Sequence, residues 1–161
     1  MVLVLSIVLL LAIGVGATIA YFHLASGPVI NTFQAGSAGA VINEQVSGNV
    51  KTEITVTNDG KSPVYVRLRL VSYYEDAEGN VLPQASPMLS FTKGSKWFPM
   101  GNYYYYNAPV AAGDTTQDLL DTDLAMAEGQ VIEVLADTVQ ATPAQAVKDA
   151  WGVDASAFIG K

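Results

Sequence analysis

Alternating apolar and polar residues predict β-strands along most of the chain beyond residue 40. In residues 64–74 the even-numbered Val and Leu side chains would face one side, and Tyr65, Arg67 and Arg69 would face the other. This period of two is typical of a strand with one buried face. Similar patterns predict further strands at residues 41–46, 51–57, 97–98, 103–106 and 131–140.

Short polar stretches predict where the chain turns. Residues 58–61, NDGK, predict a tight hairpin between the strands at 51–57 and 64–74, because an Asp-Gly pair supplies the positive φ of such a turn. Residues 100–102, MGN, predict a turn between two aromatic strands. Frequent turns between short strands indicate a mostly β fold, an antiparallel β-sandwich or jelly roll.

One short helix is predicted near the C-terminus. Thr142 can cap its start, Pro143 suits the first helical position, and Gln145 would complete a capping box. The helix should end at Gly152.

The first 22 residues carry no charge, and their apolar run at 2–13 passes into the stretch 14–20, which is rich in small residues. This pattern is typical of an export signal, with Thr18 and Ala20 at the −3 and −1 positions and cleavage before Tyr21. The alternative is a retained membrane helix, because residues 1–22 are about long enough to span a bilayer. We therefore expect a signal or anchor at residues 1–20, an extended segment at 21–40 and a β domain at 41–161.

Charge and cysteine content narrow the classes of partner. The net charge is −7, which argues against binding to nucleic acid or to anionic lipid surfaces. We expect membrane contact only through residues 1–22, if they are retained. The absence of cysteine excludes disulfides and thiolate chemistry. No cofactor is expected.

Catalytic and metal-binding side chains are too few to predict an enzyme. Zinc hydrolysis needs about three protein ligands, and a catalytic triad needs a base, yet His23 is the single histidine. The acidic residues of the stretch 114–123 could bind calcium, but their spacing matches no EF-hand and a solvated acidic loop is the simpler interpretation. We expect no catalytic residues and no metal site.

Aromatic residues and two arginines offer other possibilities. Trp97, Phe98 and the four tyrosines at 103–106 could form a sugar-stacking platform or pack in the core and at an edge. Because alternate tyrosines of a strand point to opposite faces, we expect two of the four to enter the core and two to be exposed. Arg67 and Arg69 could bind an anionic ligand, or could pair across strands with carboxylates such as Glu53 on a solvated face of the sheet.

The segment from residue 21 to 33 is the most suggestive of function. It carries no acidic or basic residue other than His23, and Pro28 disfavours a helix. It could be a mobile terminus, or it could add as a strand to an exposed sheet edge, with Val29, Ile30 and Phe33 filling pockets.

Several stretches in this order resemble the TasA/camelysin (CalY)-like family of exported biofilm matrix proteins, which a SipW-type signal peptidase processes. These are residues 16–22 (GATIAYF), 31–36 (NTFQAG), 54–60 (ITVTNDG), 64–68 (VYVRL), 103–106 (YYYY), 113–116 (GDTT) and 150–152 (AWG).

The resemblance implies a jelly roll and assembly into extracellular fibres, in which the N-terminal segment of one subunit completes the sheet of the next. We therefore expect a secreted structural protein whose main partner is itself, head to tail, with other matrix proteins or the cell envelope as further partners. The alternatives are a monomeric, membrane-held module that binds a glycan or a host protein and, behind it, a secreted metallopeptidase.

Overall fold

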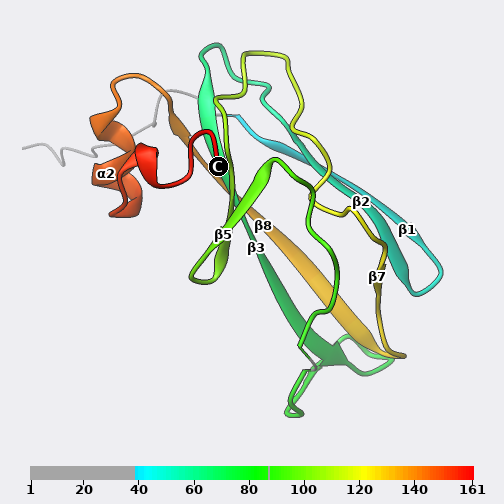
Figure 1. Ribbon diagram of the computed structural model, residues 1–161. Coiled ribbons are helices and arrows are strands. Elements are labelled where there is room, and N and C mark those ends of the chain that lie inside the picture. The colour runs from blue at the N-terminus through cyan, green and yellow to red at the C-terminus, as the bar shows by residue number, and fades with distance from the viewer. Residues whose placement is uncertain (1–38, 87) are drawn as a thin grey trace, which may run out of the picture. The chain divides into compact units, whose positions relative to one another are not determined.

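The computed structural model describes residues 39–86 and 88–161, which are mostly β with one short α-helix near the C-terminus (Figure 1). The predicted export signal and donor segment lie outside these residues. Among the described residues, no helix is long and apolar enough to cross a membrane.

The strands form two antiparallel sheets. The smaller sheet has the order β1-β2-β7, from strands Val41–Ser47, Val50–Thr57 and Leu124–Ala125. In the larger sheet, β3 (Val64–Glu75) pairs along its length with β8 (Gln130–Gln140), so the two run side by side in Figure 1. On its other side, β3 pairs with β6 (Tyr103–Tyr106) and with β4 (Val81–Leu82), and β5 (Trp97–Met100) pairs with β6.

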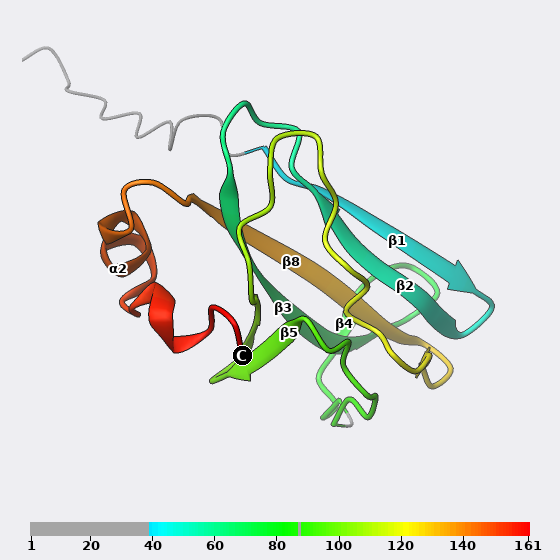
Figure 2. The same cartoon turned by 45° about the horizontal axis from the view of Figure 1, so that its top comes forward.

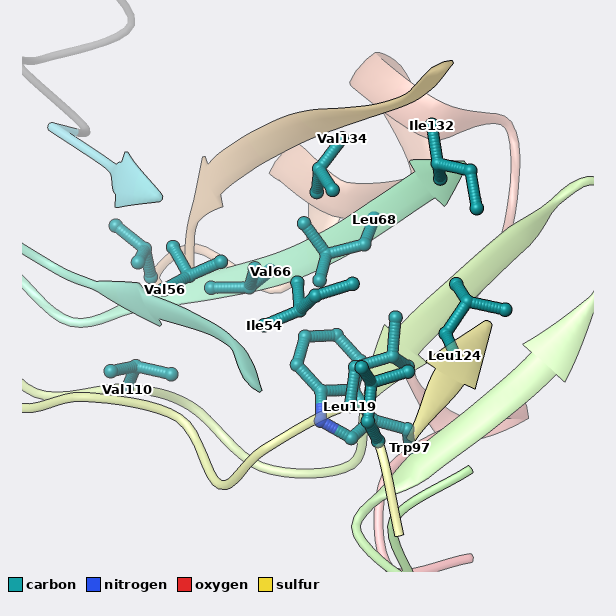
Figure 3. Packing of buried hydrophobic residues seen from close by; sticks show 12 residues of the cluster. Ile54, Val56, Val66, Leu68, Trp97, Val110, Leu119, Leu124, Ile132 and Val134 are labelled. Carbon is teal, nitrogen blue, oxygen red and sulfur yellow. The ribbon is translucent and has the colours of Figure 1, made fainter. Parts of the chain in front are cut away.

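The main hydrophobic core draws on both sheets, as Figure 3 shows. The even-numbered residues Val64, Val66 and Leu68 of β3 are almost fully buried in it, which confirms the predicted alternation. The other sheet contributes Ile54 and Val56 of β2, also fully buried. Burying such side chains stabilises the fold by about 1.5–3 kcal/mol each.

A second core lies on the opposite face of β3, where sequence reasoning had placed Tyr65 without a partner. The C-terminal segment, with α2 (Gln145–Trp151) and the 3-10 helix η1 (Ala155–Ala157), covers one end of the β3–β8 ladder (Figure 2). The ring of Phe158 packs edge-on against Tyr65, with 5.5 Å between the ring centroids. Residues Tyr65, Tyr105, Val139, Val147, Trp151 and Phe158 make up this core.

The predicted hairpin at residues 58–61 is wrong. Strands β2 and β3 belong to different sheets and do not pair, so the chain crosses between sheets here. The buried side chain of Asn58 holds the turn, and its Oδ1 accepts the N–H of Gly60 at 3.0 Å. No tight hairpin forms at this turn, and Gly60 accordingly lacks the positive φ that such a hairpin would require.

The helix start is also corrected. Helix α2 begins at Gln145 with Ala144 as N-cap, and no side chain caps it. The amide of Gln145 donates instead to Asp149 at 2.8 Å, so it cannot reach back to form the predicted capping box with Thr142. The predicted end is confirmed, since Gly152 takes the left-handed conformation that favours glycine.

Candidate functional site

The described residues hold the half of the predicted assembly site that would accept a strand, namely the sheet edges. The cleavage residues Thr18, Ala20 and Tyr21 and the donor residues Val29, Ile30 and Phe33 all lie outside the described part of the chain, so their predicted roles remain predictions. A donated strand needs an edge with backbone groups pointing outward and a row of apolar neighbours.

The long strand β8 provides one such edge. All of its 11 residues pair with β3 on one side. On the other side, residues 131–137 border no strand among those described. Ile132 and Val134 are buried in the main core, whereas Glu133 and Leu135 are exposed on the opposite face, with Leu135 43% accessible. A strand added here would extend the larger sheet.

The strand β1 forms one edge of the smaller sheet, and two of its features disfavour pairing with a further strand. Its register against β2 shifts between Gln45 and Val46, as at a β-bulge. Glu44 forms an ion pair with the buried Lys51 of β2. Bulges and charges at an edge are devices that discourage further pairing, so β1 is the poorer acceptor of the two.

The acidic stretch at residues 114–123 has a structural use in the fold. Asp118 accepts the backbone N–H of Ile54 at 2.8 Å and that of Leu120 at 2.9 Å, which pins this loop to β2. Asp114, Asp121 and Asp123 are exposed. In the residues that the structure describes, no group of three or more His, Cys, Asp or Glu side chains could hold a metal ion.

The sequence-based expectation of no metal site predicts that chelation leaves the fold unaffected. We expect EDTA to change the melting temperature of the protein by no more than the error of the measurement, because we predict that no metal contributes to its folding. Circular dichroism melts with and without EDTA test this. A large drop that calcium or zinc reverses would show that the acidic stretch is a metal site.

The four consecutive tyrosines divide between the two faces of β6, as their alternation predicts. Tyr104 and Tyr106 face the main core, where Tyr106 packs 5.1 Å from the ring of the buried Trp97. On the other face, Tyr105 is only 3% accessible, because Trp151 and Phe158 cover it. The expectation of two exposed tyrosines is thus wrong, and no flat aromatic platform forms from these four rings.

Arg67 joins the sheet to the C-terminal helix. Its Nε and Nη2 donate to one carboxylate oxygen of Asp137 on β8, at 2.9 and 2.7 Å. Its guanidinium lies 4.1 Å from the ring centre of Tyr103 and 4.8 Å from that of Trp151, within the range of cation–π contacts. Burial lowers the pKa of Arg67, but hydrogen bonds to Tyr105 and Asp137 outweigh it and raise the pKa.

The pairing of Arg67 is of the predicted cross-strand kind, but with Asp137 instead of Glu53, which lies on β2 in the other sheet. Sequence reasoning missed Trp151 as its second partner. The signal was the apolar pair Val147 and Trp151, four residues apart in the predicted helix, which marks the face that α2 buries.

Comparison with known proteins adds no assignment: no protein-family model, no curated protein and no solved structure matches this chain.

Proposed function

We propose that this protein is an exported structural subunit of extracellular fibres, which assembles head to tail by donating its N-terminal segment to the next subunit. The mature chain would begin at Tyr21, and the β domain would be a sandwich of the jelly-roll kind. The resemblance of several motifs to the TasA/camelysin-like matrix proteins supports this proposal. We propose no catalytic activity for it.

The observation that carries the proposal is the long edge of the larger sheet. Over residues 131–137, strand β8 borders no described strand other than β3, while Ile132 and Val134 anchor it in the core. A firmly held strand of this length is a template for main-chain hydrogen bonds from an extended segment. Such an exposed edge is a liability for a protein that must stay monomeric.

The donor segment has suitable chemistry for this edge. Residues 28–33, PVINTF, are uncharged, and in an extended chain Val29 and Phe33 lie on one face while Ile30 lies on the other. Backbone pairing would supply generic affinity, and these three side chains would supply register. A contact between unlike surfaces that does not close into a ring produces a filament.

Negative-stain electron microscopy of the secreted protein tests this proposal. Filaments of uniform width are expected, and a mass spectrum should give an N-terminus at Tyr21. Protein that stays monomeric at high concentration across the pH range would favour the second candidate, a monomeric surface module that binds a glycan or host protein. Proteolysis that depends on a metal would favour the least expected candidate, a secreted metallopeptidase.

Processing should depend on the small residue at the cleavage position. Ala20→Asp should block release, because a charge would enter the small pocket of the peptidase, and unprocessed chain should accumulate with the cells. Immunoblots of the cell and medium fractions measure this, with Ser26→Asp as a control beyond the cut. Normal secretion of the Ala20 variant, or a mature end elsewhere, would contradict the assignment.

A further inference from the structure

An open pocket of about 400 Å³ lies where the tip of the β5–β6 hairpin meets β3, apart from the β8 edge. This volume falls within the range of ligand sites, about 300–1,000 Å³. Its walls come from three parts of the chain: β3, the loop before β5, and the hairpin. The residues that line it are Arg69, Leu70, Leu89, Pro99, Gly101, Asn102, Tyr103 and Tyr104.

The two arginines of β3 differ in how their charges are satisfied. Arg67 is engaged by Asp137 and by aromatic rings. Arg69 is exposed at the pocket, and no ion pair is formed by it among the described residues. The residue opposite Arg69 on β8 is Leu135, whereas the residue opposite Arg67 is Asp137.

Nearby carboxylates leave the charge of Arg69 available. The acidic neighbours on the same face of β8 are Asp137, which Arg67 occupies, and Glu133, which lies opposite Val71. Glu133 is therefore a diagonal neighbour of Arg69, at about 7–8 Å between backbone positions in such a ladder. At the surface the attraction between charges at this separation is weak, so Glu133 would not prevent a ligand carboxylate from binding Arg69.

We propose that this pocket binds a carboxylated saccharide, with Arg69 as the residue that recognises the carboxylate. The planar guanidinium presents parallel N–H groups that match a carboxylate. Asn102 and the hydroxyl group of Tyr103 can donate to and accept from sugar hydroxyls. Leu70 and Leu89, which pack against the main core, form the apolar end of the pocket.

The mixture of groups favours a sugar over an acidic peptide. A pocket at a hairpin tip that combines one cation, one amide, one phenol and two leucines suits a ring with many hydroxyls and one charge. An acidic peptide would need several cations, and among the described residues Arg69 is the single basic one that lines the pocket. This site does not depend on fibre assembly, and it serves a filament or a monomer equally.

Calorimetric titration of the secreted protein with a trimer of galacturonic acid tests the proposal. We expect saturable binding that weakens as salt is raised, and at least a tenfold loss when the methyl ester of the trimer replaces the acid. Arg69→Gln should cost at least about tenfold in affinity, the loss expected for a charge-assisted hydrogen bond. Arg69→Lys should retain part of the affinity.

Lys61→Gln is the matched control, because it removes one exposed positive charge outside the pocket and should leave binding unchanged. Because Arg69 is exposed, its variants should have the same melting temperature as the wild-type protein. Three results would overturn the proposal: no binding of the acidic trimer, equal binding by Arg69→Gln, or tighter binding of a tetraglutamate peptide. None of these depends on whether filaments form, so a failure here is distinct from a failure of the fibre proposal.

Discussion

Deletion of residues 21–33 is expected to abolish filament formation and to leave a soluble, folded β domain. The core clusters of the described residues use no residue before Ile42, so the deletion removes none of this packing. What it would remove is the proposed donor strand, whose backbone bonds with β8 of the next subunit make the filament contact. Electron microscopy and sedimentation measure assembly, and circular dichroism measures folding.

Single substitutions refine this test without shortening the chain. Val29→Asp and Phe33→Asp should each reduce assembly strongly, because burying an unpaired carboxylate costs several kcal/mol unless it is neutralised. Ser37→Asp adds the same charge beyond the segment and should assemble normally. Excess free peptide of residues 21–33 should cap growing ends. Filaments of unchanged morphology from the truncated protein would refute strand donation.

The six longer strands could be predicted because each carries its own pattern, whereas the two-residue strands β4 and β7 are too short to carry one and were not predicted. In β3, the placement of Val66 and Leu68 on one face and of Arg67 on the other requires only the geometry of a single strand. The partner of each strand could not be predicted in the same way. A tight turn and a crossover between sheets both use a short polar stretch, and the difference here is made by the buried contacts of Asn58, which involve residues far away in the chain.

The packing of the C-terminal segment on β3 could not be predicted for the same reason. The sequence predicts a helix ending at Gly152, but not which surface it packs on. The face of β3 that carries Tyr65 and Arg67 was expected to be solvated, because arginines usually are. In the fold, Trp151 and Phe158 enclose it, and Arg67 stays charged there because Asp137 and the rings surround its guanidinium. For the pocket beside Arg69, the sequence offered only an arginine that could bind an anion.

Substitution of Asn58 by Asp is expected to be among the most destabilising single changes in the β domain. The Asn58 side chain is fully buried, and its Nδ2 donates to the carbonyl oxygens of Ser62 and Val110, both at 2.9 Å. Its own backbone N–H and C=O bind Asp114 and Gly113, so the residue ties the crossover to the loop after Val110. Asp has the same shape but no amide to donate.

At neutral pH the Asn58→Asp variant should lose about 3–5 kcal/mol, as when a buried charge is left without a partner. That is a large share of the total stability of a typical domain, about 5–15 kcal/mol. Burial and the two facing carbonyls should raise the pKa of the new carboxyl above its unfolded value. The protonated form is therefore favoured by folding, so the variant should be least impaired below the unfolded pKa, and its deficit should grow as pH rises through the folded pKa.

Urea unfolding of the wild-type protein and the variant at matched pH values, from about 4 to 7, measures this difference and cancels the titration of the other carboxylates. Asn49→Asp is the control, since Asn49 is exposed in the β1–β2 turn and the change adds the same charge. Its stability should stay within about 0.5 kcal/mol of wild type. If the Asn58 variant unfolds at the same urea concentration as the Asn49 variant at pH 7, the buried amide does not hold the two sheets together as its hydrogen bonds imply.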